Sequence, residues 1–499
     1  MADNNNNTTN ESQESSSTPN PIPASFDAKQ IREILRLMEA QAINDPGMTK
    51  LEREEAEEKK AEHKFWSTQP VPKSADVIEK DGPLHPPLPA DQIPQEPYEL
   101  PSGMKWCILD VETDEHVDEL HNLLLENYVE DADSMFRFSY SAEFIRWALM
   151  PPGFSKEWHV GVRREDTDEL IAFISGIPVD VMVRDKTIRM AEINFLCLHK
   201  SLRTQRLTPL MIKEVTRRVH LVGIFQAIYT VGKLLPKPVA TCRYFHRTLN
   251  PRKLMDTGFT QKLEGPQLAK VMSLMRLPST TSIPGLRLMR KSDVGQVRKM
   301  LNRYLKTRTD VLPVFRTDEE IEHWFMPREG VIWTYVVEDP EHVGRLTDFF
   351  SFYSLPSSVL KAPSKSKGKS VKRPQGVPAK KQSTTVNAAY LFYYSVKTDH
   401  GIKLSDDEKA ECGGQKKEKA LVKEKENSLI KDRLTSLMSD ALIVASTQKF
   451  DVFNCLDMMD NSMFTTDLKF GPGDGYLRYY LFNYMARPVD STKVGFVML

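Results

Sequence analysis

The strongest constraint on the fold is a long internal repeat. Leu109–Tyr128 is matched by Leu286–Leu305, and Glu143-Phe-Ile-Arg-Trp147 is matched by Glu320-Ile-Glu-His-Trp324, so the two tryptophans lie 177 residues apart. Solenoid and propeller repeats have periods of roughly 20 to 50 residues, so a repeat this long is one whole domain used twice. We therefore expect two similar halves that share a hydrophobic core.

Hydrophobic patterning predicts that each half mixes strands and helices. In the first half it predicts strands at Trp106–Val111, Trp158–Arg163, Leu170–Pro178, Thr187–Leu198 and Ile224–Val231, and helices at His116–Tyr128 and Pro209–Val222. In the second half, the aromatic segment Leu346–Pro356 takes the place of Leu170–Pro178. Strands with helices between them indicate an α+β fold with a mixed sheet.

Composition excludes several classes of protein. The 499 residues are 40% hydrophobic, which supplies a substantial core, and 68 basic residues balance 68 acidic ones. A neutral chain is a poor candidate for DNA binding, which needs a large cationic surface. The five cysteines are scattered without a CxxC pair, which indicates neither a disulfide framework nor a zinc site and favours a reducing compartment. We expect neither a signal peptide nor a transmembrane helix.

The remaining segments predict a domain plan. We expect a disordered, charged region at residues 1–62, a proline-rich extended arm at 63–104, and two halves at 105–283 and 284–499. The second half contains two insertions, at 361–383 and 403–427, which we expect to be disordered on the surface. The first is strongly basic, and either contacts an anionic partner such as a ribosome or membrane surface or is a solvated loop.

A basic loop between a strand and a helix predicts an anion site. After the strand that ends near Leu198, the loop carries Lys200, Arg203 and Arg206, and Thr208-Pro209 suits the N-cap and first turn of a helix. Backbone N–H groups at a helix start bind anions, and nearby cations strengthen that binding. The loop therefore predicts a diphosphate cradle, and coenzyme A is one ligand that fits it.

The C-terminus is the second unusual feature. The chain ends Val494-Gly-Phe-Val-Met-Leu499, without a polar tail. Most termini fray, so an apolar end predicts a docked strand. Docking would carry the α-carboxylate of Leu499 inward, where it needs a partner such as a substrate ammonium. The alternative is an ordinary buried chain end.

Several motifs together resemble the N-myristoyltransferase family. Besides Glu192–Pro209, they are His63-Lys-Phe-Trp66, Tyr128-Val-Glu-Asp131, Met135-Phe-Arg-Phe138, Cys242-Arg-Tyr-Phe-His-Arg247, Asn250-Pro-Arg-Lys253 and Phe470-Gly-Pro-Gly-Asp-Gly475. The resemblance implies an acyl-CoA N-acyltransferase (GNAT-like) fold, duplicated into two pseudo-symmetric halves that share a saddle-shaped mixed sheet. It implies a monomeric cytoplasmic enzyme that moves a myristoyl group from myristoyl-CoA, as co-substrate, to an N-terminal glycine amine by direct attack, without a metal or a further cofactor.

The resemblance also assigns residues. It makes the Leu499 carboxylate the base and the backbone N–H groups of Phe195 and Leu196 the oxyanion hole, although their strand alone would indicate only a core element. It places acyl-CoA at His63, Lys64, Phe65, Trp66, Phe195, Leu196, Cys197, Leu198, Thr204, Gln205, Arg206, Leu207 and Thr208. It places the peptide at Tyr128, Asp131, Phe136, Phe138, Asn194, Thr230, Tyr244, His246, Tyr353, Ser357, Tyr390 and Asp474.

Other interpretations stay open from sequence alone. The chain could be another acyltransferase of the same superfamily that uses acetyl-CoA, or a non-catalytic protein that binds N-terminal glycines or ribosomes. Cys197 could be an acyl-enzyme nucleophile, but no pattern links it to an activating histidine, so we expect a small core residue. His199 and His246 could relay protons or be structural. Acyl-chain selectivity, the targets and the order of binding are not set by the sequence.

Overall fold

The computed structural model describes residues 54, 63–130, 135–203, 205–360, 385–398, 402–405, 408, 412 and 414–499. The predictions for most of region 1–62, for the insertion at 361–383, and for Asp131 and Thr204 lie outside these residues. None of the helices in the described ranges is long and apolar enough to cross a membrane.

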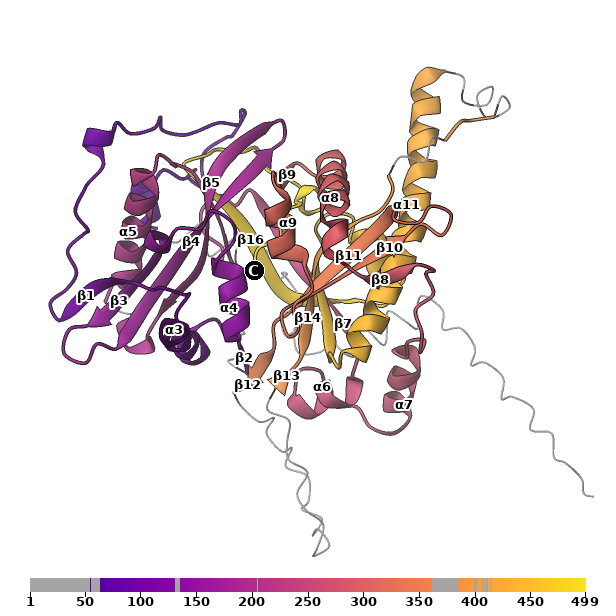
Figure 1. The fold of residues 1–499 in the computed structure, drawn as a ribbon, viewed down its shortest axis with the longest axis horizontal. Coiled ribbons are helices and arrows are strands. Elements are labelled where there is room, and N and C mark those ends of the chain that lie inside the picture. The colour runs from indigo at the N-terminus through magenta and orange to yellow at the C-terminus, as the bar shows by residue number, and fades with distance from the viewer. Residues whose placement is uncertain are drawn as a thin grey trace, which may run out of the picture.

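One large mixed sheet runs through the molecule (Figure 1), and its strand order is β1-β3-β4-β5-β6-β16-β7-β15-β14-β11-β10-β8, with β9 paired to β4. The strands are β1 (Met104–Ile108), β3 (His159–Arg164), β4 (Leu170–Val183), β5 (Lys186–Leu198), β6 (Ala227–Val231), β7 (Ala240–Thr248), β8 (Leu286–Leu288), β9 (Val311–Pro313), β10 (Ile332–Glu338), β11 (Leu346–Ser354), β14 (Ala388–Ser395), β15 (Val452–Leu456) and β16 (Gly471–Phe482). A small second sheet joins β2 (Phe136–Phe138), β12 (Ser357–Val359) and β13 (Thr385–Val386).

The arrangement of strands in the large sheet is pseudo-symmetric about its centre. Along its main path, β5–β6 and β14–β15 are the parallel pairs, and they occupy equivalent places in the order. The two central strands are exchanged, because β16 pairs with β6 of the first half whereas β7 pairs with β15 of the second. This arrangement confirms the α+β fold of two halves sharing one sheet. The predicted boundary between residues 283 and 284 stays a prediction, since the exchanged strands cross it.

Helices cover this sheet. They are α3 (Asp114–Asn127), α4 (Ala142–Leu149), α5 (Leu207–Leu221), α6 (Pro251–Thr257), α7 (Gly265–Leu274), α8 (Val294–Arg308), α9 (Asp318–Phe325), α11 (Gln415–Thr447) and α12 (Ser462–Thr465). The repeat-related helices α4 and α9 begin alike, with the hydroxyls of Ser141 and Thr317 accepting hydrogen bonds from backbone N–H groups three residues on.

The same two helices meet where the halves join. The rings of Trp147 and Trp324 lie 5.2 Å apart, edge to face. Trp147 Nε1 donates to the His323 carbonyl at 3.1 Å, and His323 Nε2 lies 2.7 Å from the Trp147 carbonyl. Residues matched by the sequence repeat therefore pack against each other at the centre of the molecule.

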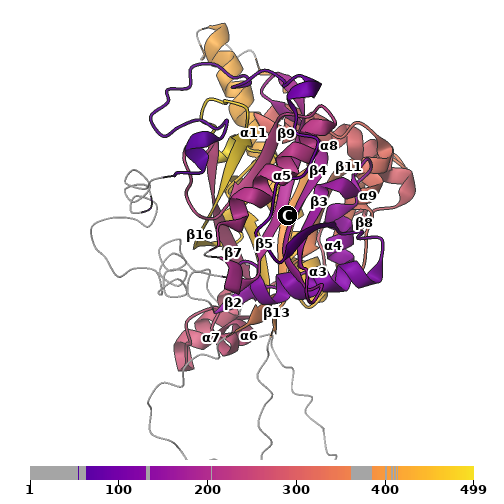
Figure 2. The ribbon, with the colours of Figure 1, turned by 90° about the vertical axis from the view of Figure 1, so that its left-hand side faces the viewer.

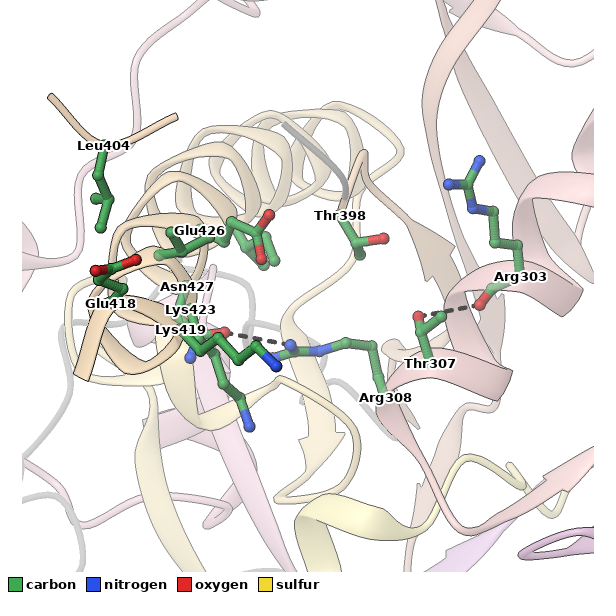
Figure 3. Close-up of a pocket in the computed structure, with 12 residues that line it drawn as sticks. Arg303, Thr307, Arg308, Thr398, Leu404, Glu418, Lys419, Lys423, Glu426 and Asn427 are labelled. Carbon is green, nitrogen blue, oxygen red and sulfur yellow. Dashed lines mark hydrogen bonds between the residues drawn. The ribbon is translucent and has the colours of Figure 1, made fainter. Parts of the chain in front are cut away.

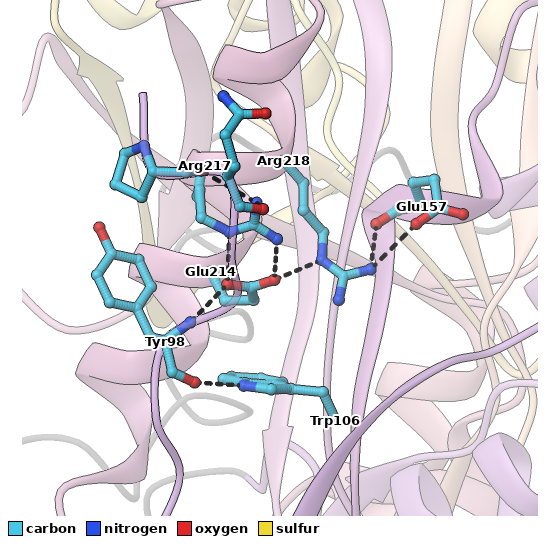
Figure 4. A network of polar contacts seen from close by, with 8 residues as sticks. Tyr98, Trp106, Glu157, Glu214, Arg217 and Arg218 are labelled. Carbon is cyan, nitrogen blue, oxygen red and sulfur yellow. Dashed lines mark hydrogen bonds and ion pairs between the residues drawn. The ribbon is translucent and has the colours of Figure 1, made fainter. Parts of the chain in front are cut away.

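The proline-rich arm is extended apart from 3-10 turns at Trp66–Thr68 and Ala90–Gln92, and a buried charge network fastens it to α5 (Figure 4). Glu214, fully buried, accepts hydrogen bonds from Arg217, Arg218 and the Tyr98 backbone. Arg217 also donates to the carbonyls of residues 94 and 95. The buried charges of Glu214, Arg217 and Arg218 are therefore paired with one another. Their further hydrogen bonds to the backbone of the arm hold the arm against α5.

Three sequence predictions need correction. Residues 415–427 are helical, within α11, and not disordered. Lys, Glu, Ala and Leu are strong helix formers, and α11 contains neither glycine nor proline to stop it. The chain end is not a strand, because only Val494 forms an isolated bridge, with Val311. Several predicted element ends shift by a few residues; for example, β1 ends at Ile108 rather than Val111.

Candidate active site

A β-bulge interrupts the pairing of β4 with β5. Phe173 pairs with Cys197 and Ser175 with Asn194, so Phe195 and Leu196 together face the single residue Ile174. Phe195 takes a left-handed backbone conformation, with φ of +56°. A non-glycine residue in this region is strained, and such strain is typical of functional sites. The bulge thus turns the backbone of the two predicted oxyanion residues out of the regular ladder.

Polar groups gather beside the bulge. Burial raises the pKa of the Tyr128 phenol, and the nearby Phe195 backbone N–H offsets part of that rise. Asn194 Nδ2 donates to Glu192 Oε1 at 2.7 Å. Burial also raises the pKa of the Glu192 carboxyl, to about 7. The Phe195 N–H therefore lies near a phenolic oxygen.

Aromatic side chains predicted for the peptide site form one group. Phe138 packs edge to face on Tyr390 at 6.4 Å, and Tyr390 stacks on Tyr353 at 5.4 Å. Tyr244 stacks with His246, whose Nδ1 lies 2.7 Å from Asn454 Oδ1. Burial lowers the pKa of His246, which favours a neutral ring. The structure brings together these residues from β2, β7, β11 and β14.

The other predicted peptide residues border this group. Phe136 contacts Phe259, which in turn contacts His246. Asp474 lies in β16 near His246, whose pKa its charge raises. Ser357 pairs with Phe138 across the small sheet, and Thr230 pairs with Tyr479 between β6 and β16.

The C-terminal segment is buried in the main core. Val494, Phe496, Val497 and Met498 are at most 8% exposed, and Leu499 packs half-buried against the same core. A Cβ at Gly495 would collide with Thr309, so only glycine allows this close approach. Figures 1 and 2 both show the C-terminus near the middle of the molecule.

A chain of contacts links this segment to the bulge. Val497 N donates to the Tyr393 hydroxyl at 2.9 Å, and the charge of Glu192 acts on Tyr393. Glu192 in turn holds Asn194, the neighbour of Phe195. The C-terminal segment therefore lies within electrostatic range of the bulged strand β5.

The basic loop forms, but its helix begins earlier than predicted. Helix α5 starts at Leu207, preceded by Arg206 with φ of +55°, and no side chain caps it. Thr208 is therefore not the N-cap, and Pro209 lies inside the first turn. Lys200 pairs with Glu130 at 3.0 Å, and Arg203 donates to the Asn127 carbonyl at 2.7 Å, so α3 positions the loop.

The aromatic arm motif lies against the sheet. Trp66 stacks on Tyr229 of β6 at 5.7 Å, and Phe65 contacts Trp66 edge to face at 5.1 Å. Ser67 N donates to the His63 carbonyl, and the Ser67 hydroxyl donates to the Lys64 carbonyl. Gln205 lies exposed in the basic loop, whereas Leu198 and Leu207 are buried in the core cluster beneath α5.

The alternative catalytic groups Cys197 and His199 have structural roles. Cys197 is 2% exposed, and burial raises the pKa of its thiol to about 12, so it stays protonated. The His199 ring caps the short turn after β5 by accepting from Ser201 N. Neither arrangement activates a nucleophile.

Sequence reasoning missed several residues. Tyr140 contacts Tyr128, Phe138 and Phe195, and the alternation of Phe136, Phe138 and Tyr140 along an extended segment was its signal. Asn454 is a buried amide in an otherwise apolar strand, which is also a recognisable signal.

A hollow lies away from this site (Figure 3). It is lined by Arg303 and Arg308 of α8, by Thr398, and by Glu418, Lys423 and Asn427 of α11. Arg308 is already held by Asp460 and Asn427. The hollow contains none of the predicted site residues.

Comparison with known proteins identifies the family. Residues 83–242 match "Myristoyl-CoA:protein N-myristoyltransferase, N-terminal domain", and residues 256–370 and 372–497 match its C-terminal domain. The chain is 42% identical to glycylpeptide N-tetradecanoyltransferase 1 of Arabidopsis thaliana (88% of this chain, 89% of that one) and 42% identical to the enzyme of Schizosaccharomyces pombe (95% and 97%). It resembles the crystal structure of Saccharomyces cerevisiae N-myristoyltransferase with bound myristoyl-CoA, with a TM-score of 0.76, 41% identity, and 88% and 99% of the two chains covered. The chain therefore belongs to the N-myristoyltransferase family.

Proposed function

We propose that this chain transfers the myristoyl group of myristoyl-CoA to the N-terminal glycine amine of target proteins, with the Leu499 carboxylate as base. Family membership supports the reaction. The observation that supports the mechanism is the burial of the C-terminal segment, which is held by the hydrogen bond from Val497 N to the Tyr393 hydroxyl.

The reaction is a direct acyl transfer. The Leu499 carboxylate takes a proton from the glycine ammonium, the free amine attacks the thioester carbonyl, a C–N bond forms, and the C–S bond breaks to release coenzyme A as its thiol. An ammonium has a pKa near 8 and a C-terminal carboxyl one of about 3.5, so the carboxylate is a weak base unless its surroundings narrow that gap. An apolar environment does so by disfavouring charge.

The bulge would stabilise the intermediate. As the amine attacks, negative charge builds on the thioester oxygen, and fixed N–H donors at this point commonly contribute a rate factor of about 10² or more. The Phe195 N–H lies near the Tyr128 hydroxyl, so the thioester oxygen would bind where it can accept from this N–H. The shift of Phe195 and Leu196 out of the ladder supports their role as donors.

The two substrates would lie on either side of the bulge. We place the coenzyme A phosphates at the basic loop and the start of α5, where Arg206 is exposed, and the arm residues Phe65 and Trp66 beside the acyl-CoA. We place the peptide against the aromatic group of Phe138, Tyr244, Tyr353 and Tyr390, with Asp474 available to a basic side chain. Asp131 and Thr204 complete the proposed contacts.

The same proposal covers the setting. The five cysteines are free thiols, and four of them are buried, which fits a reducing compartment such as the cytoplasm. We propose a monomer that needs no metal or further cofactor, with the ribosome as a further partner.

Truncation tests the base. A chain lacking Met498 and Leu499 should lose turnover of a Gly-starting peptide, by at least about 10²-fold, yet still bind myristoyl-CoA. The matched control Leu499→Met keeps the terminal carboxylate in place and should retain turnover. An Ala-starting peptide and acetyl-CoA serve as substrate controls. Full turnover by the truncated chain would remove the carboxylate from the mechanism.

A further inference from the structure

The second half of the sheet contains a counterpart of the active-site bulge. Between β11 and β14, Phe350 pairs with Tyr394 and Phe352 with Leu391, so Phe392 and Tyr393 face the single residue Ser351. The register makes Ser351 the equivalent of Ile174, and Tyr393 the equivalent of Leu196. The domain was therefore duplicated together with its bulge.

The two bulges differ in what occupies their backbone groups. In the second half, Tyr393 N donates to Ser351 Oγ at 3.1 Å, and Ser351 Oγ donates to the Tyr393 carbonyl at 2.8 Å. In the first half the equivalent position holds Ile174, a fully buried side chain that can neither donate nor accept. The N–H that corresponds to a proposed oxyanion donor is thus consumed inside the protein in the second half.

The side chain of the closed bulge has another contact. The Tyr393 hydroxyl accepts a hydrogen bond from Val497 N at 2.9 Å, two residues before the terminal carboxylate. Tyr393 is 2% exposed, and its ring is fixed edge to face by Phe315, Phe325 and Phe392. Upstream, Gly495 N donates to the Val311 carbonyl at 2.7 Å and Met459 N to the Val494 carbonyl at 3.1 Å. Among the hydrogen bonds that the structure describes for the tail, the bond to Tyr393 is the nearest in sequence to the chain end.

We infer that Ser351 and Tyr393 make the second bulge a clamp that positions the C-terminal carboxylate for the reaction in the first half. The inference rests on the proposed role of Leu499 as base. Tyr393 is a positioning residue, since it acts through Val497 and not on substrate. One copy of the duplicated bulge therefore binds the acyl group, while the other holds the base.

The test compares two adjacent tyrosines. Tyr393→Phe removes the hydroxyl that holds Val497. The matched control Tyr394→Phe removes an equally buried hydroxyl that instead contacts Asn461 and the Asp460 backbone. Each variant is assayed for kcat and KM with a Gly-starting peptide, for myristoyl-CoA binding, and for release of Leu499 by carboxypeptidase. Loss of a hydrogen bond of ordinary strength changes a rate or an equilibrium constant by about fivefold to tenfold.

The clamp predicts that Tyr393→Phe alone accelerates release of Leu499 and lowers kcat about fivefold to tenfold, with KM and myristoyl-CoA binding unchanged. Equal behaviour of the two variants in either the release or the kcat measurement would overturn the inference. Carboxypeptidase release reports tail anchoring whatever the base is. A functioning truncated chain would therefore refute the proposed base, whereas an inert Tyr393→Phe alongside a dead truncated chain would refute only the clamp.

Discussion

The two halves of the sheet share their topology but differ in how their interiors are used. In the first half, Phe195 is strained and Glu192 is a buried carboxyl in the bulged strand. In the second half, no left-handed residue occurs at the equivalent bulge. The strand register makes fully buried Ala389 the pseudo-symmetric equivalent of Glu192. Strain and a buried carboxyl both cost stability, and of the two bulged strands only the one in the first half contains them, which supports the proposed placement of the chemistry there.

The helices that follow the bulged strands differ too. Helix α5 has 15 residues and begins beside the basic loop, whereas α11 has 33. The two halves therefore share their strands and bulge but differ in the helix that follows the bulged strand.

Transplanting the second half's serine into the first should have the largest effect. Ile174→Ser would put a hydroxyl opposite Phe195 and Leu196, where it would compete for the oxyanion donors. Loss of one such donor lowers kcat by about 10²-fold to 10³-fold. Steady-state kinetics with a Gly-starting peptide measures this.

The control is Ile174→Ala, which removes a similar amount of buried hydrocarbon without adding a hydroxyl. Both variants should lose about 2–5 kcal/mol of unfolding free energy. Only the serine should lose the additional rate factor. If kcat falls as much in Ile174→Ala as in Ile174→Ser, the added hydroxyl does not block the bulge N–H groups. The difference between the two bulges would then not explain which of them takes part in the reaction.

Replacing the buried Glu192 carboxyl by a neutral side chain, as at the equivalent position of the second half, should have a smaller effect than Ile174→Ser. Burial raises the pKa of the Glu192 carboxyl from 4.5 to about 7, so the folded state holds this proton more tightly than the unfolded state does. Its stabilising contribution is complete below pH 4.5 and is lost as the pH rises through 7. Glu192→Gln cannot ionise, so it removes this loss of stability at high pH, and its side-chain oxygen can still accept a hydrogen bond from Asn194.

We therefore expect Glu192→Gln to gain up to about 2–3 kcal/mol relative to the natural chain between pH 4.5 and pH 8. Denaturant unfolding at both pH values measures the gain. Asp293 is a suitable control, because the pKa of its carboxyl is lowered despite burial, through hydrogen bonds from Arg287 and the Arg290 backbone, and its replacement should destabilise the chain most at high pH. A pH-independent difference for Glu192→Gln would contradict the assignment.

Much of this comparison was predictable from sequence. The matched tryptophans predicted the duplication, and they pack at the join between the halves. The apolar ending predicted a buried terminus. The exchange of β7 and β16 was not predictable, because strand pairing between distant segments leaves no local pattern. The bulge was equally invisible, since Phe195 takes a conformation that residue type disfavours. The extension of α11 was misjudged because a run of Lys and Glu suits both a solvated helix and a disordered segment.

That extension gives the smallest predicted effect. The side chains of α11 described as buried begin at Ile430, so residues 415–427 add solvated turns to a helix already anchored by its later part. Replacing residues 415–427 by a short Gly/Ser linker should change kcat and KM less than about twofold and the unfolding free energy by about 1 kcal/mol, since it removes the part-buried hydrogen bond from Arg308 to Asn427 at 3.2 Å. A deeper deletion that also removes Ile430, Leu434 and Leu437 should instead cost several kcal/mol, because it opens the core. Loss of turnover in the shorter deletion, with stability retained, would mean that the longer helix of the second half was recruited for substrate binding rather than left free of it.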